Sequence, residues 1–146
     1  MEIVEITSES GDLVRPDLLA AAERVHRQLR SALESDYAAH LTRIFGQGAR
    51  MLVAQEKGGV AGVAVFRVYE NTSDGPRLYV DDLVTDEARR SGGVGGALLD
   101  RLEAEARRRG CTVLVLDSGT QRTAAHRFYF RQGMVITSFN FKKRLK

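Results

Sequence analysis

The sequence predicts an α/β (α+β) fold from three observations. Short apolar runs typical of strands alternate with segments in which apolar residues recur at helical spacing. One of these strands leads through a basic, glycine-rich turn into a long amphipathic helix. The chain has 146 residues, of which 43% are hydrophobic, so we expect a single domain over residues 1–146 with a core of its own.

The charge balance is mildly basic, with a formal net charge of +3 and a pI near 9.3. This balance suits a polyanionic small ligand and is too small to indicate nucleic acid by itself. Cys111 is the single cysteine, so no internal disulfide can form, which favours a reducing compartment. The N-terminus lacks a signal pattern, and no apolar run approaches the roughly 18 to 20 residues of a membrane span. We therefore expect a cytoplasmic protein that binds neither nucleic acid nor a membrane.

The first part of the chain predicts one strand and two helices. Residues Ile3–Ile6 indicate a short strand. A helix is expected to begin near Pro16, because proline is tolerated at a helix start. The residues that recur at helical spacing in this helix are Leu18, Leu19, Ala22, Val25, His26 and Leu29. A second helix is predicted from Tyr37 to Phe45.

The middle of the chain predicts a β-hairpin. Met51–Ala54 and Val60–Tyr69 are the two predicted strands, and Lys57–Gly59 is the turn between them. Gly62, inside the return strand, indicates a bulge. Asn71–Pro76 has the composition of a loop.

The remaining elements surround the glycine-rich turn. Arg77–Thr85 is the predicted strand that feeds the turn, and a helix follows from about Gly95 to Arg109. On this helix Leu98, Leu102 and Ala106 form the buried face, while Arg101, Glu105 and Arg109 form a solvated one.

Three further elements are predicted towards the C-terminus. Cys111–Asp117 is an unbroken apolar run that predicts a buried strand. Thr123–Gln132 predicts a shorter helix, which Gly133 ends. Met134–Phe141 predicts a last strand that closes the sheet.

The glycine-rich turn predicts an anion site. It contains Arg89 and Arg90 together with Gly92, Gly93, Gly95 and Gly96. Glycine lets the main chain approach a ligand closely or adopt positive φ. Backbone N–H groups at a helix start bind anions with the help of the helix dipole, and arginine adds charge-assisted donors suited to phosphate. We expect a phosphorylated ligand here, with Arg90 favoured over Arg89 for the phosphate contact.

Known phosphate-binding motifs narrow the choice. A P-loop needs Gly-Lys followed by Ser or Thr, which does not occur, and a dinucleotide fingerprint starting at Gly93 would need a glycine where Leu98 stands. The run Arg90-Ser91-Gly92-Gly93-Val94-Gly95 fits the [QR]-x-x-G-x-[GA] pattern of the GNAT superfamily of acyl-CoA-dependent N-acyltransferases. The predicted element order β-α-α-β-β-β-α-β-α-β is also that of the GNAT fold. The chain therefore resembles this family over nearly its whole length.

This resemblance implies a fold and a ligand. The implied GNAT fold has a central mixed, mostly antiparallel sheet of about six to seven strands, splayed between strands 4 and 5 and flanked by four helices. Acetyl-CoA would bind as the acyl donor, with its pantetheine arm along the main chain of Leu83, Val84 and Thr85. The residues that would wrap its pyrophosphate are Arg90, Ser91, Gly92, Gly93, Val94, Gly95 and Gly96. For the side chains of Leu83 and Val84, plain core packing is the alternative.

The segment RTAAHRFYFRQGM resembles a second family motif, N-x-x-A-x-x-[FL]-Y-x-x-x-G-[FM]. Ala125 and Tyr129 match, and they imply a cofactor contact and a general acid for the departing thiolate. A phenol with an ordinary pKa near 10 can protonate a thiolate whose thiol has a pKa of about 8.5 to 10. Arg122 replaces the family's asparagine, and its guanidinium could reach a phosphate instead. A core aromatic is the alternative for Tyr129.

Carboxylates near the expected gap between strands could accept a proton from the amine. Strand alternation puts Asp82 and Val84 on one side and Asp81 and Leu83 on the other. Asp82 is our first choice for the base or for binding the amine, and Asp117 could orient the amine. A turn-capping role is an equal alternative for either residue.

The histidines and the cysteine do not form a metal-binding pattern. His26, His40 and His126 have no metal-ligand spacing with Cys111, so we expect no metal and structural or surface roles for all three histidines. Cys111 opens an apolar strand without a histidine base beside it, which argues against a covalent acyl-cysteine route.

The predicted function is N-acetyl transfer from acetyl-CoA to a primary amine by direct transfer in a ternary complex. The alternative is a sensor that binds CoA or a nucleotide without turnover, which the departure at Arg122 favours. The resemblance places the acceptor on the first helices and on the loop between the third and fourth strands. Acidic groups and a tyrosine there could attract a small-molecule or peptide amine; they are Glu34, Asp36, Tyr37, Glu70 and Asp74. A homodimer is also allowed.

Overall fold

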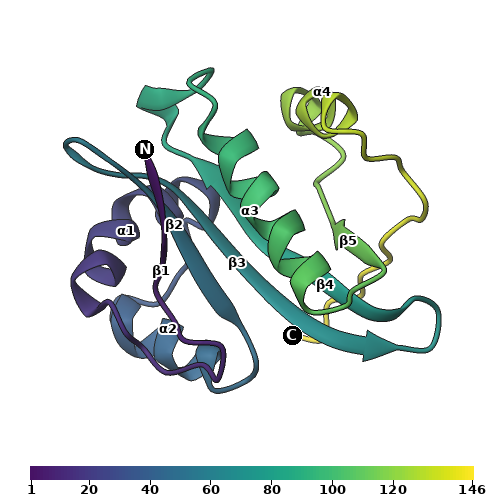
Figure 1. Cartoon of the computed structure of the whole chain (residues 1–146), viewed down its shortest axis with the longest axis horizontal. Helices are drawn as coiled ribbons and strands as arrows, with labels where there is room; N and C mark the ends of the chain where they lie inside the picture. Colours follow the sequence, from purple (N-terminus) through teal and green to yellow (C-terminus); the bar gives the residue numbers. More distant parts are fainter. The chain divides into compact units, whose positions relative to one another are not determined.

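The computed structural model describes residues 1–146. In chain order the elements are β1 (Glu2–Glu5), α1 (Pro16–Leu29), α2 (Tyr37–Phe45), β2 (Arg50–Glu56), β3 (Gly59–Asn71), β4 (Gly75–Thr85), the 3₁₀ helix η1 (Glu87–Arg89), α3 (Val94–Arg108), β5 (Val113–Leu116) and α4 (Thr123–Arg131) (Figure 1). The four predicted helices and the first five predicted strands are confirmed, and η1 is an addition. The chain divides into two compact units, Met1–Val115 and Leu116–Lys146, so the single domain stays a prediction.

The strands form one sheet in the order β1-β2-β3-β4-β5. The pairs β1–β2, β2–β3 and β3–β4 are antiparallel. α3 connects β4 to β5, and a helical crossover joins parallel neighbours, so the sheet is mixed and mostly antiparallel. The expected six to seven strands are wrong, because the sheet has five. β5 is half-buried, contrary to the prediction of a buried strand, because it stands at the edge of the sheet.

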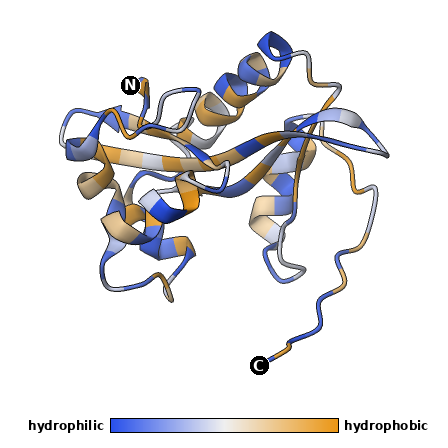
Figure 2. Cartoon of the chain, turned by 90° about the horizontal axis from the view of Figure 1, so that it is seen from below, coloured by the Kyte–Doolittle hydropathy of each residue, from blue (hydrophilic) through white to orange (hydrophobic).

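The strand predicted from Met134 to Phe141 is absent. The residues after Gly133 form neither helix nor strand, and Val135, Ile136, Phe139 and Phe141 are 70% to 93% exposed. Figure 2 shows apolar and polar residues interleaved along this segment. Such a pattern is typical of a strand, but a strand also needs a partner edge, which a pattern alone does not supply.

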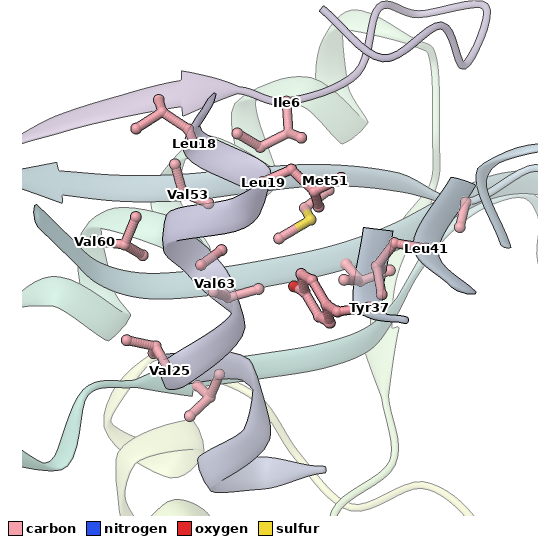
Figure 3. Packing of buried hydrophobic residues seen from close by; sticks show 14 of the residues in the cluster. Ile6, Leu18, Leu19, Val25, Tyr37, Leu41, Met51, Val53, Val60 and Val63 are labelled. Atoms are coloured by element: carbon pink, nitrogen blue, oxygen red, sulfur yellow. The ribbon is translucent and has the colours of Figure 1, made fainter. Parts of the chain in front are cut away.

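Helices cover both faces of the sheet in the first unit. α1 and α2 pack on one face over a buried cluster that includes Leu19, Leu41, Met51, Val53 and Val63 (Figure 3). Successive residues of a strand point to opposite faces. Gly62, next to Val63, accordingly faces the other side, where it lies against Val94 and Leu98 of α3.

Two bulges interrupt the hairpins of the sheet. The register of β2 and β3 shifts so that Ala61 has no direct partner, which puts the predicted bulge next to Gly62. The register of β3 and β4 shifts between Val65 and Phe66, which leaves Asp81 of β4 unopposed. A bulge bends its strand and re-aims the side chains beside it. The second bulge directly precedes Asp82, one of the candidate site residues.

The second unit contains α4. Tyr129 is the buried residue of this helix, and its ring packs edge-on against Phe128 with ring centroids 5.4 Å apart. The backbone N–H of Met134 donates to the carbonyl of Tyr129 over 3.0 Å, which ends the helix. Neither unit contains a helix with both the length and the apolar character needed to cross a membrane.

Candidate functional site

The turn between β4 and α3 has the backbone that its glycines predict. Gly93 is the N-cap of α3 and has a φ of 82°, in the left-handed region that glycine adopts without strain. Ser91 also has a positive φ, of 68°, which costs free energy for a residue with a Cβ. The chain thus accepts local strain in this turn, as functional loops often do.

The start of α3 is open to an anion. No side chain caps this helix, so the first backbone N–H groups of α3 have no side-chain acceptor. Arg90 is exposed and makes no hydrogen bond or ion pair, whereas Arg89 is paired with Glu56 at the end of β2. The unpaired arginine beside the uncapped helix is a suitable phosphate site, and the pairing of Arg89 agrees with the preference for Arg90.

The C-terminal half of β4 supplies main-chain groups at the edge away from β3. Leu83 and Val84 have buried side chains, and Val84 belongs to the core cluster, so both side chains pack as core residues. Their backbones pair with Ala64 and Val63 of β3. β5 begins beside Pro76, where Thr112 N–H donates to the Pro76 carbonyl over 2.9 Å, and β5 has only four residues. At an equal rise per residue β5 therefore ends well short of Leu83 and Thr85 on the 11-residue β4.

Asp82 is held by His26 of α1 and by Arg30, the C-cap residue of that helix. His26 Nε2 lies 2.7 Å from Asp82 Oδ2, and Arg30 Nε donates to Asp82 Oδ1 over 2.7 Å. Arg30 also donates to the carbonyl of Asp81, the bulged residue, over 3.0 Å. On its other side His26 Nδ1 lies 2.9 Å from the hydroxyl of Tyr37, so the buried imidazole joins α1, α2 and β4.

The contacts with His26 and Arg30 determine whether Asp82 can act as a general base. Burial alone would raise the pKa of Asp82, but the hydrogen bonds and charges of His26 and Arg30 outweigh burial and hold the pKa below its ordinary value. A carboxylate with a lowered pKa accepts a proton less readily. The geometry therefore favours Asp82 as an anchor between β4 and α1 over the role of general base.

The acidic groups expected to attract an amine do not form an open acidic surface. Four of the five groups already have partners in the structure. Glu34 pairs with Arg43, Asp36 caps α2, Tyr37 is buried against His26, and Asp74 pairs with Arg77. Glu70 is exposed, and it is the only one of the five that makes no hydrogen bond or ion pair.

The second unit carries the other candidate residues. Burial raises the pKa of the Tyr129 phenol, and the nearby Arg122 offsets part of this effect. The hydroxyl therefore stays protonated at neutral pH, as a proton donor must. Ala125 is half-buried on the same helix, and Arg122 is the N-cap residue of α4. Asp117 is exposed and accepts a hydrogen bond from Asn140 Nδ2 over 2.8 Å.

Cys111, His40 and His126 lie in environments that favour neither a nucleophile nor a metal ligand. Burial raises the pKa of the Cys111 thiol, which disfavours the nucleophilic thiolate. His126 Nε2 lies 2.9 Å from the carbonyl of Gly119, and His40 Nδ1 accepts from the N–H of Glu34 over 3.3 Å. No three His, Cys, Asp or Glu side chains are grouped so that they could hold a metal ion.

A hollow of about 80 Å³ lies where the C-terminal end of α3 packs beside β1 and β2. Its charged side chains already have partners. Arg101 pairs with Glu5, Arg108 with Glu9 and Arg109 with Glu105, and Arg50 donates to main-chain carbonyls. Arg101, Glu105 and Arg109 were expected on a solvated face, but these ion pairs fasten them to β1 and to one another. Because its charges are satisfied, this hollow is not a candidate site.

Sequence reasoning missed one group of residues beside the turn. Asp86 follows β4 and is only 2% exposed, and its carboxylate accepts from Arg24 and Gln28 of α1. The N-cap pattern of an aspartate before Glu87–Arg89 is a signal that could have identified Asp86 as a cap. No local pattern predicts its partners, because they lie 58 and 62 positions away in the sequence.

The fold, the uncapped glycine-rich helix start and the unpaired Arg90 are the features expected of an acyl-CoA-dependent acyltransferase. The model of the acetyltransferase (GNAT) family matches residues 16–134. The chain therefore belongs to the GNAT family of acetyltransferases, as its sequence resemblance predicted.

Two curated relatives agree with this assignment. An uncharacterized N-acetyltransferase of Bacillus subtilis is 38% identical over 94 residues, which cover 54% of this chain and 66% of the relative. The aminoalkylphosphonate N-acetyltransferase of Salmonella typhimurium is 36% identical over 66 residues, which cover 45% of this chain and 43% of the relative. The matched part of the chain thus spans less than two thirds of either relative.

Solved structures share the fold. The aminoglycoside N-acetyltransferase AAC(6′)-Iy in complex with CoA superposes with a TM-score of 0.79 at 17% identity, covering 98% of this chain and 93% of that chain. At this identity the likeness concerns the fold.

Proposed function

We propose that the chain transfers the acetyl group of acetyl-CoA to the primary amine of a small molecule, by direct transfer in a ternary complex. The observation that carries the proposal is the turn from Arg90 to Gly96. It combines an uncapped helix start, a Gly93 with positive φ and an arginine without a partner. The uncapped N–H groups and the guanidinium are the kinds of donor that a pyrophosphate requires.

The chemistry of the donor set fits acetyl-CoA. The backbone N–H groups of Val94, Gly95 and Gly96 and the guanidinium of Arg90 would hold the pyrophosphate, with Ser91, Gly92 and Gly93 shaping the turn. The main chain of Leu83, Val84 and Thr85 would pair with the pantetheine arm as an added strand does, along the stretch of β4 that extends beyond β5. Arg122 and Ala125 are further proposed contacts. When bound, acetyl-CoA supplies the activated acetyl group.

The proton transfers are assigned to two kinds of residue. Tyr129 would donate its phenolic proton to the sulfur of the departing thiolate, and its raised pKa keeps that proton in place at neutral pH. Of the two candidate carboxylates, Asp117 is exposed and makes a single hydrogen bond to Asn140, so it is available to orient the amine. Asp82 is engaged by His26 and Arg30, and its proposed contribution is to fix the end of β4.

A small amine acceptor is supported by the relatives. One relative is named as an aminoalkylphosphonate N-acetyltransferase, and one solved structure with the same fold is named as an aminoglycoside N-acetyltransferase. A peptide amine is the other acceptor class, and a competition assay between small amines and a lysine peptide separates the two. The homodimer and the cytoplasmic location remain predictions that size-exclusion chromatography and cell fractionation test.

The experiment that tests the proposed function is amine-dependent release of the CoA thiol. Purified protein is incubated with acetyl-CoA and a panel of polyamines, amino sugars, aminoalkylphosphonates and lysine peptides. Thiol release that depends on one amine, with the acetylated amine found by mass spectrometry, is the expected result. Binding of acetyl-CoA without release for any amine would instead identify a sensor that binds CoA without turnover.

A further inference from the structure

The carboxylate of Asp86 is buried directly before the cofactor-binding turn and is fully engaged. It accepts from Arg24 Nη2 over 2.7 Å, from Gln28 Nε2 over 3.1 Å and from the N–H of Ala88 over 3.2 Å. Its own backbone N–H donates to the carbonyl of Ala61 in β3 over 2.8 Å. A carboxylate that is 2% exposed needs such partners, because an unpaired buried charge is costly.

Gln28 binds two residues that precede the turn, Asp86 and Glu87, with both ends of its amide. Its Nε2 donates to Asp86, and its Oε1 accepts from the N–H of Glu87 over 2.9 Å. The two contacts require opposite ends of the amide, so they fix its orientation. Arg24 and Gln28 are one helical turn apart, and together they attach α1 to the first two residues after β4.

The attachment ends where the proposed phosphate contacts begin. Asp86–Arg89 is fastened at three places, because Arg89 also pairs with Glu56 of β2. The following residues, Arg90–Gly93, make no side-chain hydrogen bond, and their N–H and guanidinium groups are free. The place of these free groups is therefore set by the fastened residues before them and by α3 after them.

We propose that Arg24 and Gln28, through Asp86, are positioning residues that hold the cofactor-binding turn in place. This inference rests on the proposed function, because it assigns the turn to acetyl-CoA. Donors that must meet a pyrophosphate within a few tenths of an ångström need a rigid support, and a loose support lowers affinity even when every donor is present. The effect should appear in acetyl-CoA binding and leave the chemistry itself unchanged.

The test is Arg24→Met, which keeps the length of the side chain and removes its charge and donors. We expect the dissociation constant of acetyl-CoA to rise by about tenfold, as for the loss of one hydrogen-bonded charged partner. We also expect KM for acetyl-CoA to rise with kcat little changed, and amide hydrogen exchange at residues 87–93 to accelerate in the free protein. Arg24→Lys should restore part of the affinity, because it restores the charge.

The matched control is Arg15→Met. It removes a bidentate arginine–aspartate pair at the start of the same helix, with Asp17, that is exposed and does not touch the turn. Wild-type affinity for acetyl-CoA in Arg24→Met would contradict the positioning role and leave the proposed function standing. An equal loss of affinity in Arg15→Met would assign the effect to α1 as a whole and likewise overturn it. A wild-type protein that binds no acetyl-CoA would contradict the proposed function together with the positioning role.

Discussion

The imidazole of His26 lies 2.7 Å from the carboxylate of Asp82 while its other nitrogen meets the hydroxyl of Tyr37. His26 is 1% exposed, so this connection between α1, α2 and β4 is part of the core. A buried polar group is stable there because each nitrogen has a partner. Asp82, which the sequence favoured as a base, is thereby bound to the scaffold at the end of the strand that would carry the cofactor.

The Asp82→Asn variant tests whether this carboxylate accepts the proton. We expect kcat to fall by less than about tenfold, short of the 10²- to 10⁴-fold that a positioned base contributes. The pH dependence of kcat/KM should keep its shape. Steady-state kinetics over pH measure both, with Asp117→Asn as the matched carboxylate variant. If the acidic limb of the profile disappears in Asp82→Asn, Asp82 is the base despite its partners.

The acid dependence of stability tests the contact between Arg24 and Asp86. The hydrogen bonds from Arg24 and then Gln28 hold the pKa of Asp86 well below its ordinary value. A lowered folded pKa stabilises the fold above the unfolded pKa of about 4, and this contribution is lost as pH falls through the folded pKa. Asp86→Asn should lower the free energy of unfolding by about 1–2 kcal/mol at pH 7, because the arginine is partly solvated.

The same difference should persist at pH 5 and shrink below about pH 4, where the carboxylate gains a proton in the unfolded chain while it stays ionised in the folded one. Urea unfolding of both proteins at a series of pH values measures it. A difference that stays equal down to pH 2 would show that the substitution acts through packing and not through the charge.

Gly62 sets the distance between β3 and α3. A Cβ at this position would lie 2.7 Å from Val94 Cγ1, 2.9 Å from Leu98 Cδ1 and 3.2 Å from the carbonyl oxygen of Val84. Val94 and Leu98 are buried and cannot move away cheaply. Gly62→Ala should therefore destabilise the protein by about 1–3 kcal/mol through overpacking. Chemical denaturation measures the change, and an increase in stability would contradict the close packing.

Tyr129 is the proposed general acid. Tyr129→Phe keeps the ring and loses the hydroxyl, so we expect kcat to fall by about 10²- to 10⁴-fold. KM for acetyl-CoA should change little. Kinetics with a confirmed amine, together with circular dichroism, measure the effect in a folded variant. A kcat within about threefold of wild type, with chemistry rate-limiting, would make Tyr129 a core aromatic.

The elements of the first unit were predictable because each has a local cause. Pro16 at the start of α1, the turn at Lys57–Gly59 and the helical spacing of Leu98 and Leu102 all act within a few residues. The positive φ of Gly93 in the turn was predictable for the same reason, since glycine adopts it without strain.

The features that the sequence did not predict depend on contacts between residues far apart in the chain. The C-terminal end of β4 is fixed by His26 and Arg24, which stand more than fifty positions earlier in the chain. The segment Met134–Phe141 has the alternation of a strand and no partner, a difference that only the three-dimensional arrangement reveals. Local pattern therefore identified the donors of the candidate site, while their supports appeared only in the structure.

The most direct test of acetyl-CoA binding at the glycine-rich turn is calorimetric titration of acetyl-CoA into wild-type protein and Gly95→Val. Gly95 is the second residue of α3 and does not have a positive φ, so valine fits the helix without a loss of helix propensity. Asp100→Ala, an exposed change further along α3, is the control. We predict that Gly95→Val stays folded and binds acetyl-CoA about 100-fold more weakly, a loss of about 2.8 kcal/mol, while the control binds as wild type. Wild-type affinity in a folded Gly95→Val would contradict the assignment of acetyl-CoA to this turn.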